Sequence, residues 1–125
     1  MNKKKLLFVI RHSPYGNLLA REGLDAILAA SVYEQALSVL FLDDGVFQLA
    51  SAKKTTLEQK SISRLLSAFP LYDINKIFVC QSSLEQRSLD INTLCLAVEP
   101  LDSDEVHYLM QQQDQPSTVP EHSGG

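Results

Sequence analysis

Tryptophan is absent from this sequence, and cysteine and methionine are scarce. Only two of each occur among the 125 residues. Cys80 and Cys95 are too few for the disulfide framework that stabilises many small secreted domains. We therefore expect two reduced thiols and a protein that works in a reducing compartment.

Long hydrophobic runs are also missing. No segment approaches the roughly 18 consecutive apolar residues that a membrane-spanning helix needs. The apolar run at residues 6–10 is too short for the core of a signal peptide, and no small-residue cleavage site follows it. The sequence therefore predicts a cytoplasmic protein with no contact with a membrane.

An excess of basic residues is lacking as well, because 11 Lys and Arg stand against 15 Asp and Glu. Binding to a phosphate backbone depends on clustered Lys and Arg, and the net charge here is −4. Residues 3–5 (Lys-Lys-Lys) form the one basic cluster, and they are explained as the solvated entry to a strand. Direct binding of nucleic acid is not expected.

Neither a metal site nor a cofactor is predicted. The two cysteines and three histidines are too scattered for zinc-ligand spacing. The loop at residues 11–17 contains one glycine, Gly16, where a dinucleotide site uses several. Two alternatives stay open: this loop could hold the phosphate of a nucleotide or flavin, and Asp43 with Asp44 could bind a hard cation. A simple turn explains the Asp-Asp-Gly run at residues 43–45 more economically.

The apolar pattern predicts a single α/β domain with a parallel sheet. Apolar runs typical of buried strands alternate with helical periodicity, which indicates strand-helix-strand units joined by right-handed crossovers. Strands are expected at residues 6–10, 37–42, 77–80 and 94–98. One helix is expected at residues 18–35, and a second runs through residue 69 and is ended by Pro70. Asp102 or Ser103 can cap a last helix, with Glu105 near a capping-box position.

Two segments do not fit this pattern. Residues 46–49 are apolar but short, and we expect Phe47 and Leu49 to stay partly exposed as a contact surface for other subunits. The domain is expected to span residues 1–112. Residues 113–125 lack periodicity and contain Pro116 and Pro120, so they are expected to be a disordered tail that can be removed without loss of stability.

Cys80 is the principal candidate for chemistry. It ends a predicted strand, where reactive groups gather in open α/β sheets, and a helix N-terminus or Arg87 could activate its thiol. The competing interpretation is a structural cysteine at a strand end, which residue statistics favour. Cys95 is expected inside a strand. His12 could act as a base, but no carboxylate is placed to orient it.

Several segments together resemble the DsrF/TusC branch of the DsrE/F/H-like family. The resemblance runs in order from about residue 5 to about residue 110. Its strongest parts are residues 21–26 (Arg-Glu-Gly-Leu-Asp-Ala) and 44–49 (Asp-Gly-Val-Phe-Gln-Leu). The segments at residues 13–16, 71–74 and 79–84 are similar too.

This resemblance implies a flavodoxin-like sheet and assembly with two homologous subunits, of the TusB and TusD types, into a heterohexamer made of two heterotrimers. Such a complex takes persulfide sulfur from an upstream donor and passes it to a downstream carrier. In the Tus branch the sulfur reaches the wobble uridine of tRNA as 2-thiouridine. In the Dsr branch the related subunits serve dissimilatory sulfur oxidation.

The resemblance also bears on Cys80. The family's persulfide-bearing cysteine belongs to the TusD/DsrE-type subunit, at a strand end comparable to that of Cys80. The TusC-type subunit is regarded as non-catalytic, so a scaffold role is expected here, with a Cys80-dependent sulfurtransferase as the alternative. Family members finish with an apolar strand, whereas this chain has Gln-Pro-Ser-Thr-Val-Pro at residues 115–120. We expect either a sheet that lacks this strand or an edge filled by a partner.

Overall fold

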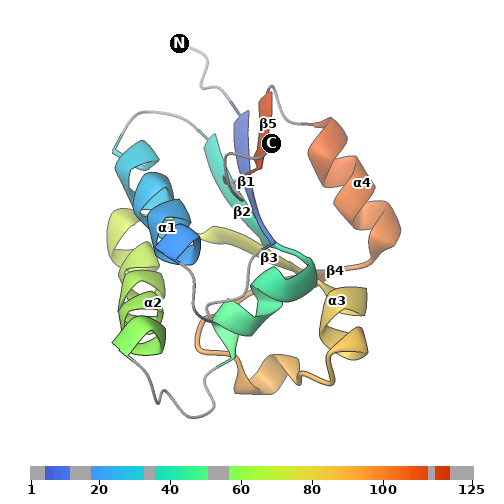
Figure 1. Cartoon of the computed structure of the whole chain (residues 1–125). Coiled ribbons are helices and arrows are strands. Elements are labelled where there is room, and N and C mark those ends of the chain that lie inside the picture. The colour runs from blue at the N-terminus through green and yellow to red at the C-terminus, as the bar shows by residue number, and fades with distance from the viewer. Residues whose placement is uncertain (1–4, 12–17, 33–35, 51–56, 113–114, 119–125) are drawn as a thin grey trace.

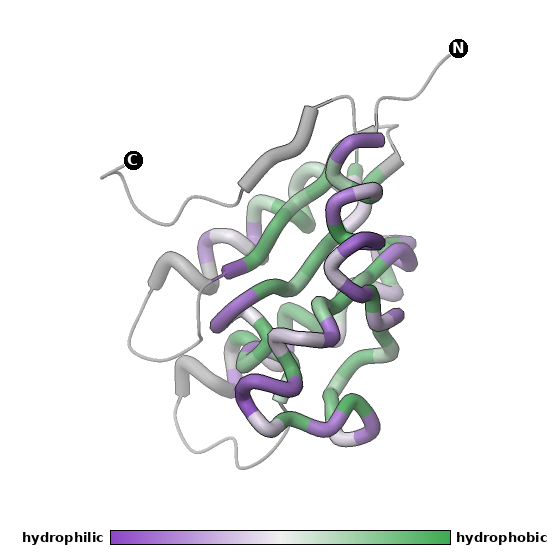
Figure 2. Tube along the Cα trace, turned by 90° about the vertical axis from the view of Figure 1, so that its right-hand side faces the viewer, coloured by the Kyte–Doolittle hydropathy of each residue, from purple (hydrophilic) through white to green (hydrophobic). Residues whose placement is uncertain are grey.

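Five parallel strands form one sheet, in the order β4-β3-β2-β1-β5 (Figure 1). The computed structural model describes residues 5–11, 18–32, 36–50, 57–112 and 115–118. The three central strands are β1 (Lys5–Ile10), β2 (Ala36–Phe41) and β3 (Lys76–Cys80). They are the apolar runs of the sequence, and they lie as hydrophobic segments between more polar helices (Figure 2).

Helices cover both faces of the sheet (Figure 1). Helices α1 (Leu18–Ala30) and α2 (Leu57–Ala68) pack on one face, where Leu24, Ile27 and Leu66 meet the β2 and β3 side chains Val39 and Val79. Helix α4 (Ser103–Gln111) lies on the other face, and its residue Val106 joins a second core cluster with Leu7, Val9, Leu40, Cys80 and Leu101. Alternate side chains of each central strand therefore enter different clusters, which explains why the strands are apolar throughout.

The single parallel α/β sheet with flanking helices is confirmed. Its strand order differs from the 2-1-3-4-5 order of flavodoxin in one respect. Here the chain adds β2, β3 and β4 on one side of β1, and only then returns through α4 to place β5 on the other side. No helix among the described residues is long and apolar enough to span a bilayer.

The fourth strand lies later than the sequence predicted. Residues 94–98 were expected to form it, but a 3-10 helix η3 (Ile91–Thr93) comes first and β4 is Glu99–Leu101. The apolar residues Leu94, Leu96 and Val98 pack against the α1/α2 cluster as irregular chain. Their backbone is held by an isolated bridge between Ala50 and Leu94 and by a 2.8 Å hydrogen bond from the Cys95 N–H to the Leu49 carbonyl. The apolar run reports burial and not strand conformation.

The C-terminal segment also departs from expectation. Residues 115–118 are not a disordered tail but strand β5 (Gln115–Thr118), which pairs in parallel with β1. Pro116 is compatible with this strand because β5 lies at the edge of the sheet, where one side of the backbone needs no partner. The sheet is therefore not one strand short. Residues 119–125 lie outside the described residues.

The short apolar segment after β2 is the 3-10 helix η1 (Asp43–Leu49). Leu49 is 0% exposed and belongs to the α1/α2 core cluster, so its expected role in a contact surface is wrong. Phe47 is only partly buried. The burial of Val46 and Leu49 was not predicted, because it results from the packing of η1 against α2. Short-range periodicity does not reveal such tertiary contacts.

Candidate functional site at the carboxyl ends of the strands

The carboxyl ends of the strands surround a cavity of about 360 Å³. Residues that end or follow β1, β2, β3 and β4 all contribute to its lining: Arg11, Asp43, Cys80 and Ser103. Ligands of open α/β sheets bind outside the carboxyl ends of the strands, because loops and helix starts gather there. This cavity is therefore the candidate functional site.

Cys80 lies at the wall of the cavity and is only 5% exposed. It is the last residue of β3 and the N-cap of the short helix α3 (Gln81–Gln86), and its Sγ lies 3.4 Å from the Ser82 Oγ. Burial, the largest single influence, raises the pKa of this thiol, but the hydroxyl and backbone hydrogen bonds of Ser82 and Ser83 outweigh it and lower the pKa below its ordinary value. The thiolate, which is the nucleophilic form of cysteine, is therefore more populated here than in an ordinary cysteine at the same pH.

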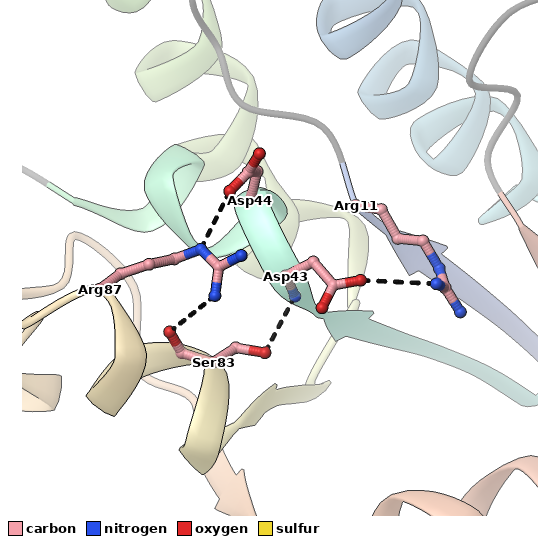
Figure 3. A network of polar contacts seen from close by, with 5 residues as sticks. All are labelled: Arg11, Asp43, Asp44, Ser83 and Arg87. Carbon is pink, nitrogen blue, oxygen red and sulfur yellow. Dashed lines mark hydrogen bonds and ion pairs between the residues drawn. The ribbon is translucent and has the colours of Figure 1, made fainter.

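Polar contacts tie the strand ends together (Figure 3). The Asp43 N–H donates to the Ser83 Oγ at 3.0 Å, and the Arg11 Nη1 lies 3.5 Å from the Asp43 Oδ2. Asp43 has a backbone φ of 52°, in the left-handed region that Asp tolerates better than most residues. These contacts fix the ends of β1 and β2 against the start of α3.

Arg87 belongs to the same network, and its described side-chain contacts are with Asp44 and Ser83. Its Nε donates to the Asp44 Oδ1 at 3.0 Å, and its Nη1 donates to the Ser83 carbonyl at 3.2 Å. The expectation that Arg87 activates the thiol is therefore not supported by its contacts. Arg11, which the sequence did not single out, is the arginine that lines the cavity.

Helix α4 forms the remaining wall. Its start is fixed by a capping box, in which the Asp102 Oδ1 accepts from the Glu105 N–H at 2.8 Å and the Glu105 Oε1 accepts from the Asp102 N–H at 2.9 Å. The sequence predicted this cap. It fixes the start of the helix that places Ser103 and His107 in the lining of the cavity. His107 is a further site residue that sequence patterns missed, since only the path of the chain from β4 brings it near Cys80.

Other candidate residues do not gather at this site. Cys95 is partly buried in the irregular segment before β4. His12 and Gly16, with the rest of the first loop, lie outside the described residues. The carboxylates of Asp43 and Asp44 face arginines, and within the described parts of the chain no three His, Cys, Asp or Glu side chains cluster as metal ligands.

A larger cavity of about 560 Å³ lies toward the opposite ends of the strands. Its lining includes Ser38, Lys76 and Leu109. Its lining contains no cysteine, and it lies at the amino ends of the strands, which ligands of α/β sheets seldom use. The smaller cavity remains the better candidate because the Cys80 thiol lines it.

Fold and site together define a parallel α/β domain with a thiol at the end of a strand. The family model for the DsrE/DsrF-like family matches residues 4–116. The chain belongs to this family.

The chain is also similar to curated proteins that carry the name "Protein TusC homolog". One from Pseudomonas aeruginosa PAO1 is 38% identical over 117 residues, which is 93% of this chain and 98% of the relative. One from Vibrio vulnificus YJ016 is 42% identical over 100 residues, covering 79% of this chain and 85% of the relative. The ychN protein from E. coli has a crystal structure that overlays with a TM-score of 0.78 at 20% identity, covering 92% of this chain and 98% of that one. This structural likeness shows that the two folds agree.

Proposed function

We propose that this chain is a TusC-type subunit of a sulfur-relay complex that delivers persulfide sulfur for 2-thiolation of the tRNA wobble uridine. The observation that carries the proposal is the 38% identity to a TusC homolog over nearly the whole length of both chains. The acidic net charge of −4 fits a subunit that contacts proteins and not tRNA.

The proposed role is that of a non-catalytic scaffold. It would hold TusB-like and TusD-like paralogues in a heterohexamer of two heterotrimers, in the cytoplasm. The upstream persulfide donor and the downstream sulfur carrier would meet the complex through the catalytic paralogue. The buried position of Cys80 supports this role, since its side chain is part of the core cluster beneath α4 and has a structural reason to be there.

A second candidate is a sulfurtransferase that uses Cys80 itself. The observation that favours it is the lowered pKa of the thiol at the wall of a cavity. A Cys80 thiolate would attack the outer sulfur of a donor persulfide and form a new S–S bond. The donor thiolate would then leave with the electron pair of the broken S–S bond.

Co-expression with tagged TusB-like and TusD-like paralogues tests the relay role. We expect all three chains to elute as one complex, and we expect deletion of this gene to lower the 2-thiouridine content of tRNA. Normal 2-thiouridine in the deletion strain, with no complex formed, would contradict the proposal. An association with subunits of dissimilatory sulfur oxidation would instead favour a DsrF-type role.

A further inference from the structure

Ser38 is the single polar residue of strand β2. Leu40, two residues later, belongs to the core cluster beneath α4, so Ser38 faces the same side of the sheet. Ser38 is only 6% exposed and lines the cavity of about 560 Å³ at the amino ends of the strands. Its hydroxyl takes part in no hydrogen bond within the described part of the chain, and it is not one of the fully enclosed polar atoms there. A polar molecule in the cavity can therefore reach this hydroxyl and supply the missing hydrogen bond.

Two charges of opposite sign lie at the rim of the same cavity. Lys76 of β3 is aligned with Ser38, and Glu99 of β4 is aligned with Phe78. Both charged residues are exposed and line the cavity, and neither forms an ion pair within the described ranges. A strand spacing of about 4.8 Å and a rise of about 3.3 Å per residue put their Cα atoms roughly 8 Å apart. One small molecule can therefore contact both charges.

An apolar surface accompanies these polar groups. Phe78 lies on the sheet side of the cavity, and Leu109 lines it from α4. Both residues are partly buried and pack against the core cluster beneath α4. Small-molecule sites combine such an apolar lining with a few polar groups that orient the ligand, in volumes of about 300–1,000 Å³. The ligand that matches these walls has an anionic group, a cationic group and an apolar part.

We propose that this cavity binds a zwitterionic α-amino acid with an apolar side chain, of which leucine is an example. The carboxylate accepts hydrogen bonds from the Lys76 ammonium and the Ser38 hydroxyl. The ammonium of the ligand donates to the Glu99 carboxylate, and its apolar side chain packs between Phe78 and Leu109.

This is a second site, separate from the cavity around Cys80. The two cavities share no lining residue. The inference concerns binding at the amino ends of the strands and does not depend on the proposed relay role. A failure of either one therefore leaves the other standing.

Titration of the ¹⁵N-labelled full-length chain with L-leucine tests the proposal. The amides of Ser38, Phe78 and Glu99 should shift together and saturate, with a Kd of about 1 mM. The amides of Ser82 and Ser83, at the other cavity, should not move. No saturable shift at about 20 mM leucine would mean that solvent alone fills the cavity and would overturn the proposal, as would saturable shifts confined to Ser82 and Ser83.

Three analogues of leucine test the three contacts separately. Isopentylamine lacks the carboxylate, 4-methylpentanoate lacks the ammonium, and glycine lacks the apolar side chain. Each should bind about threefold more weakly than leucine or worse, because each loses one of the three contacts. Binding of any one of these analogues as tight as that of leucine would refute the arrangement.

Matched variants assign the binding to this cavity. Ser38→Ala removes only the hydroxyl and should weaken leucine binding by about threefold or more. Lys76→Met and Glu99→Gln each remove one exposed charge, so they should keep the fold and weaken binding by a similar factor. Lys60→Met and Glu22→Gln, at exposed positions of α2 and α1, should change nothing. Equal losses in the cavity variants and these controls would refute the assignment.

Discussion

Gly45 lies so close to the carbonyl of Ile10 that a Cβ atom added to Gly45 would overlap the carbonyl oxygen. The contact joins η1 to the end of β1, next to the 2.9 Å hydrogen bond from the Leu42 N–H to the same Ile10 carbonyl. Because the obstacle is backbone, a larger residue has no side chain to displace. A side chain at position 45 would therefore push η1, which contains Asp43, away from the end of β1, which precedes Arg11.

Gly45→Ala should accordingly destabilise the protein. Overpacking of this kind typically costs about 1–3 kcal/mol in the free energy of unfolding, which urea denaturation can measure. Asp44→Ala serves as the control in the same helix, since it removes only the exposed half of the Arg87 contact and should cost at most about 1 kcal/mol. Equal losses in the two variants would contradict the close packing of Gly45.

The cap of α4 should also matter for the site. Asp102→Ala removes one half of the capping box and should lower the free energy of unfolding by about 1 kcal/mol. It should also perturb the NMR signals of Ser103 and His107 more than the neighbouring change Asp104→Ala does. A larger loss of stability from Asp104→Ala would show that the box does not anchor the helix.

The Cys80 thiol should ionise at lower pH than an ordinary cysteine. Donors lower its pKa because they stabilise the negative thiolate more than the neutral thiol, so the thiolate fraction rises at lower pH than it does in the unfolded chain. A pH titration of the ¹³Cβ shift of Cys80 measures this without requiring access to the sulfur. Ser82→Ala should move the midpoint upward, and an unchanged midpoint would exclude Ser82 as a donor to the thiolate.

Composition predicted that residues 113–125 can be removed without loss of stability. The pairing of β5 with β1 predicts the opposite for a truncation that removes β5. Ending the chain after Gln112 removes β5 and leaves β1 as an edge strand, so the melting temperature should fall by several degrees. Ending it after Thr118 keeps every described pairing of β1 with β5 and should have little effect. Equal melting temperatures for the two truncations would mean that β5 adds no stability.

The parts of the fold that could be predicted are those in which the local sequence pattern shows which residues are buried. Strands β1, β2 and β3 are covered on both faces, so their side chains are apolar in unbroken runs. The capping box of α4 is equally local. Strands β4 and β5 escaped prediction because they are short edge strands with Pro100 and Pro116, and an edge strand needs neither apolar residues nor every backbone donor.

Some residues of the candidate site could likewise be predicted from local sequence, and others could not. Cys80 could be placed at a strand end from the residues before it. Arg11 and His107 could not be joined to it, because they come from elements far away along the chain, and only the parallel stacking of the strands and the return of α4 bring them to one cavity. Arg87, suggested as a cation near Cys80, instead binds Asp44, which lies 43 residues away along the chain and could not be paired with it from sequence.

We propose that this chain serves the relay as a scaffold and not as the carrier of sulfur. The most direct measurement is the 2-thiouridine content of digested tRNA from cells that carry Cys80→Ser, with Cys95→Ser as the matched control and a pull-down of the paralogues to verify the complex. For a scaffold, we expect an intact complex and 2-thiouridine near its normal level in both variants. Loss of 2-thiouridine in the Cys80 variant alone, with the complex intact, would contradict the scaffold role and make Cys80 the sulfur carrier.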